Sequence, residues 1–159
     1  MIARTQKRMR RCCWLLALNL AFIWGNSLLP GEVSGALSGW VHLLIQTIFP
    51  GEGEIGQSHG LLRKMAHFSE FCTLGMLLSW LFAMLRPKTW TFIIPAMVCG
   101  CIAAFMDEGI QMLIPGRGPG ITDVGIDSLG VAAGIGLLCL GHTIYKKRKQ
   151  HIHFGGNKT

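Results

Sequence analysis

Charged residues are scarce in this chain of 159 residues: they make up 14% of it, whereas soluble domains average about 25%. Hydrophobic residues account for 50%, and the mean hydropathy is +0.42. A surface in contact with water needs more charge than this, so the composition argues against an ordinary soluble domain and indicates a membrane protein. The length is that of one compact bundle, with no room for a second soluble domain.

No cysteine lies in a polar loop of the sequence. The chain has six cysteines, and all of them fall within or beside apolar runs, where a cysteine acts as a small hydrophobic residue. Cys99 and Cys101 stand two positions apart, so on a helix they would not share a face. The sequence therefore predicts neither a disulfide framework nor a cysteine-based zinc site. Repeats and low-complexity tracts are also missing.

Long apolar runs, in contrast, are plentiful. A helix that crosses a bilayer needs about 20 apolar residues, and four runs are candidates: Cys12–Leu29, Met65–Leu85, Thr89–Ile114 and Ile121–Tyr145. We predict an all-α polytopic membrane protein with four transmembrane helices. Its membrane domain covers residues 12–145, between a basic segment, 1–11, and a basic tail, 146–159, expected to be disordered after Gln150. A cleaved signal peptide is the alternative for the first run, although that run is long for this role.

Acidic residues are missing from the segments that hold most of the basic ones. Residues 1–11, 86–88 and 146–159 carry twelve of the fifteen lysines and arginines, and all eight acidic residues lie elsewhere. Basic residues in short loops favour the cytoplasmic side, so we predict that both termini are cytoplasmic. The formal charge of +7 then reflects topology and contact with lipid headgroups, and no nucleic-acid partner is expected.

The one sizeable loop, residues 31–60, is expected on the outer side. Within it, Ser34–Phe49 has apolar residues at helical spacing and a polar stripe between them. This pattern predicts a short amphipathic helix that lies on the outer membrane surface or covers the bundle.

Ionisable residues interrupt the outer ends of three predicted spans. A helix rises about 1.5 Å per residue, so counting from the cytoplasmic ends places Glu70, Asp107 and Asp127 at similar depths. That depth is the outer edge of a hydrocarbon core about 30 Å thick. Stripes of small residues would let the third and fourth spans pack closely; they comprise Ala96, Gly100 and Ala104, then Gly130, Ala132, Gly134 and Gly136. We therefore predict one shared polar site at the outer leaflet.

Within this layer, five acidic residues face three basic ones. Residues three or four apart lie on one side of a helix, which groups Lys64 with His67 and Glu70, Asp107 with Gln111, and Asp123 with Asp127. The candidate acid–base groups are His67, Glu70, Asp107 and Glu108. The candidate ligand-binding residues are Lys64, Gln111, Arg117, Asp123 and Asp127. Asn19 and Asn26, in the first run, are expected to form hydrogen bonds between helices instead.

At this depth the expected ligand is a membrane lipid or a lipid-linked envelope precursor. Arg63, Lys64 and Arg117 would contact its phosphate or carboxylate, and His67 would act as general acid or base. A metal bound by His67 and Glu70 together with Asp107 or Asp127 is the alternative, but Lys64 and Arg117 would repel a cation, so no metal or other cofactor is expected.

A purely structural interpretation also fits these residues. An ion-pair girdle, with Arg117 against Asp123 and Lys64 against Glu108, would pin the helices together without any catalysis. Whether the protein is an enzyme is therefore left open, as is its oligomeric state. Transport is not expected, because no polar residues line the inner half of any predicted span.

Two segments resemble a known family. Lys64–Gly75 reads KMAHFSEFCTLG and resembles K-x-x-H-F-x-E-[YF]-x-x-L-G, the signature of the VanZ-like membrane protein family. Residues 107–134 are similar to its second pattern, D-E-x-x-Q-x-x-x-x-x-R followed by D-x-x-x-[ND]-x-x-G, although the GRGPGITD loop is richer in glycine. The segment NSLLPGEVSGALS is similar, more weakly, to the serine-rich segment of the family.

The resemblance covers nearly the whole chain. It implies a bacterial plasma-membrane protein of the cell envelope, with a role in glycopeptide resistance of the teicoplanin type. The polar positions of the family match Lys64, His67, Glu70, Asp107, Glu108, Gln111, Arg117, Asp123 and Asp127.

Overall fold

The computed structural model describes residues 2–48, 59–85, 91–116 and 120–155, which form five α-helices. They are α1 (Ile2–Ser27), α2 (Gly31–Ile48), α3 (His59–Leu85), α4 (Ile93–Met112) and α5 (Ile121–Gly155). No strand occurs among these residues, so the predicted all-α class is confirmed. Arg117, one of the candidate site residues, lies outside the described residues.

Three of the helices are long and apolar enough to cross a membrane: Gly60–Leu85, Ile93–Met112 and Ile121–Arg148. They indicate a multi-pass membrane protein. The expected first span lies in α1, which does not meet the same criterion within the described residues. Its apolar part is bounded by Arg11 on one side and by the helix end at Ser27 on the other. The fourth crossing is therefore not confirmed.

Proline and glycine mark several helix ends. Pro30 separates α1 from α2, because proline lacks an N–H donor and disfavours helical backbone in the preceding residue. Pro95 is accommodated in the first turn of α4, where no intrahelical donor is needed. After α4 the chain turns at Gly116, whose φ of +78° favours glycine.

Several helix boundaries differ from the sequence prediction, among them those of α3 and α5. Helix α3 begins at His59, ahead of the predicted start of the span at Met65. Helix α5 continues to Gly155, so the prediction of a disordered tail after Gln150 was wrong for residues 151–155. The basic run Lys146–Lys149 ends the apolar part of α5, but lysine and arginine are good helix formers and do not end the helix.

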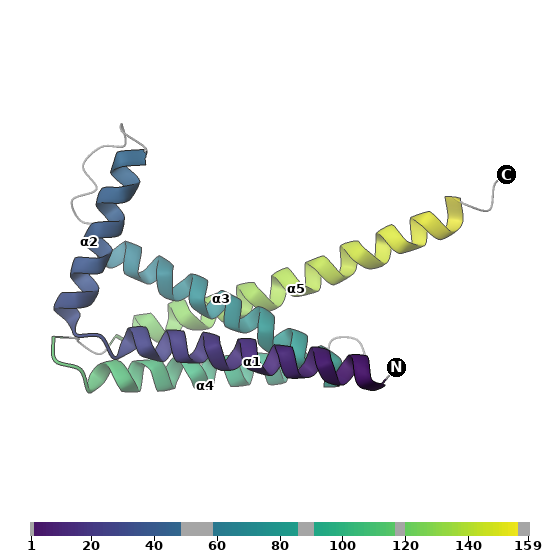
Figure 1. The fold of residues 1–159 in the computed structure, drawn as a ribbon, viewed down its shortest axis with the longest axis horizontal. Helices are drawn as coiled ribbons and strands as arrows, with labels where there is room; N and C mark the ends of the chain where they lie inside the picture. Colours follow the sequence, from purple (N-terminus) through teal and green to yellow (C-terminus); the bar gives the residue numbers. More distant parts are fainter. Residues whose placement is uncertain (1, 49–58, 86–90, 117–119, 156–159) are drawn as a thin grey trace.

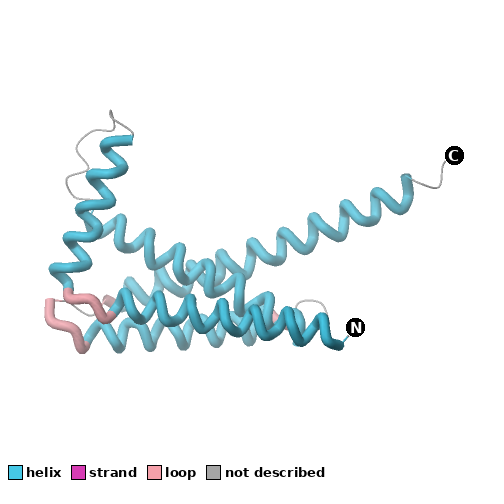
Figure 2. Tube along the Cα trace, in the orientation of Figure 1, coloured by secondary structure: helices cyan, strands magenta, loops and turns pink. Residues whose placement is uncertain are grey.

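Helices α1 and α4 run side by side, and α3 and α5 cross behind them (Figure 1). The last turns of α1 and α4 and the first turns of α3 and α5 gather at one end, opposite both chain termini (Figure 1). This end is referred to below as the distal end. Figure 2 shows α2 leaving the bundle there, steeply inclined to α1, to which a short loop joins it.

The most extensive helix pair is α3 with α5. Their backbones meet at glycines: a Cβ added to Gly134 would lie 2.0 Å from the carbonyl oxygen of Cys72, and one added to Gly75 would lie 2.3 Å from that of Val131. Small residues permit such close approach in lipid. Gly134 was expected to pack the fourth predicted span against the third; the structure instead places it against α3, whose Gly75 lies at the same interface.

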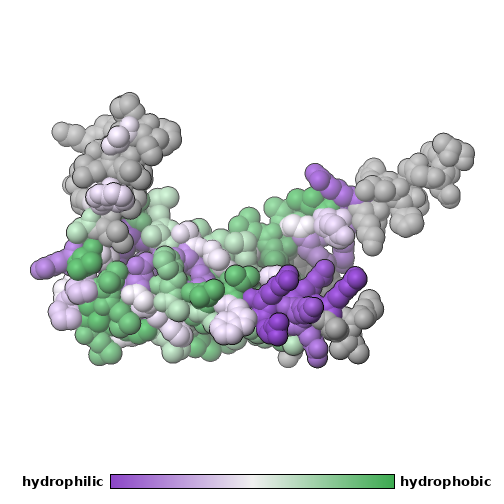
Figure 3. Space-filling view, viewed as in Figure 1, coloured by the Kyte–Doolittle hydropathy of each residue, from purple (hydrophilic) through white to green (hydrophobic). Residues whose placement is uncertain are grey.

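Large apolar side chains cover the outside of the bundle. Trp14, Phe22, Phe105, Leu113 and Leu129 are all exposed. In Figure 3, hydrophobic side chains extend along the bundle, and hydrophilic ones gather over the beginning of α1, where the first arginines and lysines are exposed. An apolar surface of this extent is typical of a protein in contact with lipid.

Candidate functional site

The distal end contains a cluster of buried polar side chains contributed by four helices. Six of the buried polar residues belong to it: Ser27 from α1, Glu70 from α3, Asp107, Glu108 and Gln111 from α4, and Asp127 from α5. Glu70 and Asp107 are both close enough to Asp127 to repel it electrostatically. The structure thus brings together acidic residues of three helices that the sequence analysis placed at one depth.

Asp107 lies at the centre of the cluster and is 0% exposed. Ser27 Oγ donates a 2.6 Å hydrogen bond to its Oδ1, and Gln111 Nε2 donates one of 2.6 Å to its Oδ2. Gln111 also accepts a 2.6 Å hydrogen bond from Arg63 at its Oε1. A continuous chain of hydrogen bonds therefore leads from the guanidinium of Arg63 to the central carboxylate.

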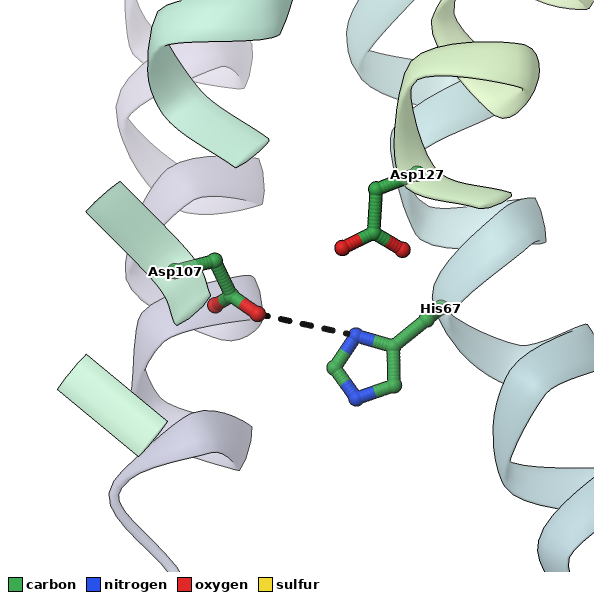
Figure 4. Close-up of side chains that lie close together, drawn as sticks. All are labelled: His67, Asp107 and Asp127. Atoms are coloured by element: carbon green, nitrogen blue, oxygen red, sulfur yellow. Dashed lines mark ion pairs between the residues drawn. The ribbon is translucent and has the colours of Figure 1, made fainter. Parts of the chain in front are cut away.

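His67 of α3 faces this carboxylate. Its Nδ1 is 3.8 Å from Oδ2 of Asp107, and its side chain is 12% exposed. Figure 4 shows the carboxylate of Asp127 pointing toward the same imidazole ring, so that α3, α4 and α5 each contribute one side chain. One potential ligand atom from each of the three residues lies within 4.8 Å of the others. The three groups are therefore arranged for proton transfer or for binding one cation.

Glu70 and Glu108 each use one carboxylate oxygen. Oε1 of Glu70 accepts a 2.9 Å hydrogen bond from Nδ2 of Asn26, and Oε1 of Glu108 accepts one of 2.5 Å from the backbone N–H of Gly120. Their Oε2 atoms, together with Oδ1 of Asp127, are buried and have no hydrogen-bond partner among the described residues. Buried polar atoms are nearly always hydrogen-bonded, so three such oxygens in one cluster require an explanation.

The basic residues occupy the rim of the cluster. Lys64 Nζ is 4.0 Å from Oδ1 of Asp123, and the Lys64 side chain is 48% exposed. The pairing of Lys64 with Glu108, expected for an ion-pair girdle, is not formed: Lys64 lies nearest to Asp123, and Glu108 accepts the N–H of Gly120. Lys64 therefore lies at the exposed edge of the cluster. Among the described residues, none of the buried acids forms an ion pair with a lysine or arginine.

Two residues of α1 complete the cluster. The expectation that Asn26 forms a hydrogen bond between helices is confirmed by its bond to Glu70. Ser27 was not singled out from the sequence. A signal was present, because counting from Cys12 along a helix puts Ser27 roughly 22 Å from the start of the first apolar run, close to the predicted polar layer. Serine is common at helix ends, and one hydroxyl did not stand out against the charged residues.

Comparison with known proteins gives one family. The family model described as VanZ/LLP1 matches residues 12–142, a range that includes every residue of the cluster described above. Neither the curated proteins nor the solved structures contain a significant match to the chain.

Proposed function

This chain belongs to the VanZ/LLP1 family, and on that premise we propose that its polar cluster binds the anionic headgroup of a membrane lipid or of a lipid-linked cell-envelope precursor. The observation that supports this most is the gradient of exposure at the start of α3. Lys64 is 48% exposed, the next turn brings His67 at 12%, and Asp107 behind it is 0% exposed. A basic rim thus leads directly to buried acid–base groups.

The proposed ligand contacts follow from the chemistry of these residues. Guanidinium and ammonium groups form strong hydrogen bonds with phosphate and carboxylate, so Arg63 and Lys64 bind the headgroup, with Arg117 as a third contact from the sequence. Lys64 is only loosely held by Asp123, at 4.0 Å, and is therefore available to a stronger anion. His67, with Asp107 beside it, exchanges protons with the bound headgroup if the protein is also an enzyme.

We further propose that α1 crosses the membrane together with the three apolar helices. It packs against α3 and α4 along the bundle, and its hydrogen bonds from Asn26 and Ser27 hold it there. With four crossings both termini lie in the cytoplasm of a bacterial cell, the distal end faces outward, and α2 lies on the outer surface.

A structural girdle is the second candidate, and the bonds of Ser27 to Asp107 and of Asn26 to Glu70 favour it, because they join α1 to α4 and α3. A girdle alone, however, leaves three buried carboxylate oxygens without hydrogen bonds. Burying a carboxylate oxygen without a hydrogen bond costs folding free energy, so a purely structural role would not favour this arrangement. A girdle therefore does not explain these oxygens, and headgroup binding is preferred because of the exposure gradient from Lys64 to Asp107.

Native mass spectrometry of the purified protein tests the proposal. We expect the wild-type protein to carry an anionic lipid or precursor, and the double variant Arg63→Ala, Lys64→Ala to bind it about a hundredfold more weakly, since each of the two lost charge-assisted hydrogen bonds costs about 1.5 kcal/mol. Lys147→Ala, an exposed lysine at the opposite end of α5, is the control and should retain the lipid. Equal retention by both variants would refute headgroup binding at this rim.

A cellular role in teicoplanin-type resistance is proposed from the family membership. Expression of the wild-type chain should lower the susceptibility of a bacterial host to teicoplanin, and the Arg63→Ala, Lys64→Ala variant should not. An unchanged susceptibility in cells that contain the protein in their membranes would argue against this role.

A further inference from the structure

The geometry of the buried acids points to a second kind of ligand: we propose that His67, Asp107 and Asp127 bind one divalent transition-metal ion. This goes beyond the proposed function, because the ion is held by side chains of the chain itself and not by a lipid. Each of the three residues comes from a different helix, and their candidate ligand atoms lie within 4.8 Å of one another. Figure 4 shows the carboxylates and the ring converging on one space.

The distances suit an ion after a small adjustment. Ligand atoms around an ion with bonds of about 2.0–2.2 Å are roughly 3–4 Å apart. Nδ1 of His67 and Oδ2 of Asp107 already lie 3.8 Å apart, which is too long for a direct hydrogen bond and suitable for two ligands of one ion. The atom of Asp127 lies within 4.8 Å of the other two, so a bound ion would have to draw its carboxylate closer.

Asp127 provides an independent observation. Its side chain is 2% exposed, and its Oδ1 has no hydrogen-bond partner among the described residues. The carboxyls of Asp107, Glu108 and Glu70 also repel it. A bound cation supplies the missing partner of Oδ1 and offsets this repulsion, whereas without one the arrangement costs folding free energy.

The surroundings orient the proposed ligands. Ser27 and Gln111 each donate a 2.6 Å hydrogen bond to Asp107, one to each oxygen, and so hold its carboxylate in a fixed position. Residues behind the ligands have this role in metal sites generally. Ser27 also accepts a 3.3 Å hydrogen bond from Nε2 of Gln111, and since it is not itself a proposed ligand, it is a positioning residue that can be tested separately.

Repulsion by nearby basic residues was the reason for expecting no metal. Within the described residues that reason loses force: Lys64 lies beside Asp123 at the rim, and Arg63 donates its hydrogen bond to Gln111. Neither forms an ion pair with a proposed ligand. The basic groups instead lie beside the buried acids, where they can bind an anion while the ion is bound by His67, Asp107 and Asp127.

The ligand types indicate which ions fit. Imidazole nitrogen is a ligand for zinc, iron and nickel rather than for Mg²⁺ or Ca²⁺, which prefer oxygen. One imidazole with two carboxylates therefore favours Zn²⁺, Fe²⁺ or Mn²⁺. Such an ion would also remove the main electrostatic objection to an anionic headgroup, since the acids alone would repel a phosphate.

Metal binding by the full-length protein in detergent or nanodiscs tests the proposal. The protein is stripped with a chelator, loaded with Zn²⁺ or Mn²⁺ and dialysed; bound metal is measured by plasma mass spectrometry, and Mn²⁺ also by its electron paramagnetic resonance spectrum. We expect one equivalent in the wild type. Asp127→Asn and His67→Ala should lower the affinity at least tenfold. The matched control is His142→Ala, an exposed histidine near the far end of α5, which should bind as the wild type does.

The following results would contradict the metal site. Failure of the wild type to retain metal, or equal binding by folded Asp127→Asn, would overturn it. Should Asp127→Asn not fold, Ser27→Ala replaces it as the test: it keeps all three ligands and should weaken binding about tenfold, and unchanged affinity would overturn the proposal. Lys64→Ala separates the two proposals, because it should keep the metal while losing lipid.

Discussion

Ser27 Oγ of α1 donates a 2.6 Å hydrogen bond to Oδ1 of Asp107 on α4, and both side chains are 0% exposed. The bond links two helices that run side by side (Figure 1). In a membrane bundle, a hydrogen bond between helices contributes roughly 0.6–2 kcal/mol, a modest value because the same groups also find partners when the helices are apart. An acceptor as deeply buried as Asp107 places this bond at the upper end of that range.

The Ser27→Ala variant measures this contribution. We expect a loss of about 1–2 kcal/mol in the free energy of unfolding, determined by titration with a denaturing detergent in mixed micelles. Ser79→Ala is the control, since Ser79 is also 0% exposed but its hydroxyl has no hydrogen-bond partner among the described residues. This control should be neutral or slightly stabilising. An equal loss of unfolding free energy in both variants would mean that the Ser27–Asp107 hydrogen bond does not stabilise the bundle.

Asp127→Asn separates the two ways of explaining the buried acids. If the acids form only a structural girdle, the substitution weakens it and the protein melts at a lower temperature. On the metal-binding proposal, removing a carboxylate whose Oδ1 has no hydrogen-bond partner among the described residues should leave the chelated protein at least as stable as the wild type, because it removes a buried charge.

On the metal-binding proposal, adding metal should make the wild type more stable than Asp127→Asn. At a free metal concentration of 100 times Kd, the wild type should gain about 2.7 kcal/mol in stability, and Asp127→Asn should gain almost nothing. Thermal melts followed by circular dichroism, with and without Zn²⁺, give both comparisons. A melting temperature of Asp127→Asn well below that of the chelated wild type would favour the girdle.

Periodicity alone was enough to group the acids of each helix. Asp107 and Gln111 are four residues apart, and the structure joins them directly by a hydrogen bond. What the sequence did not provide is the partner on another helix: nothing in it assigns Ser27 to Asp107, or Lys64 to Asp123 instead of Glu108. Those pairings depend on how the helices are rotated and spaced, which is a property of the packed bundle.

Helix limits were missed for a different reason. Hydropathy marks where a helix leaves the membrane, whereas backbone hydrogen bonding decides where the helix stops. At Lys146 the apolar run of α5 ends while the helix continues to Gly155. At the other end of the bundle, α3 starts at His59, before the apolar run begins, so that Arg63 and Lys64 are held on a rigid helix beside the cluster.

The glycine contact between α3 and α5 should control the spacing of the site. A methyl group at Gly134 would clash with the carbonyl oxygen of Cys72 at 2.0 Å, which forces the two helices apart and separates His67 from Asp127. We expect Gly134→Ala to cost about 1–3 kcal/mol, as overpacked cores do, and to lower metal binding. Stability is measured as for Ser27→Ala.

Gly136→Ala is the matched control for this contact. It lies half a turn further along α5, and an added Cβ there meets nothing within 4 Å. Because alanine is the better helix former, the control should be neutral or slightly stabilised, by up to about 1 kcal/mol. A stable Gly134→Ala protein with full metal binding would show that the site does not depend on close contact of the two helices.

The orientation of the chain depends on whether α1 crosses the membrane. If only the three apolar helices cross, the N-terminus lies outside and the C-terminus inside; if α1 crosses as well, both lie in the cytoplasm. Reporter fusions distinguish these arrangements: a fluorescent protein that matures only in the cytoplasm and a phosphatase active only outside, each placed at either terminus and within residues 51–58. The basic residues at the start of α1 are exposed and favour the cytoplasm, so we expect fluorescence at both termini and phosphatase activity in the loop. Phosphatase activity at the N-terminus would show that α1 does not cross, and would leave Ser27 and Asn26 to reach the cluster from outside the membrane.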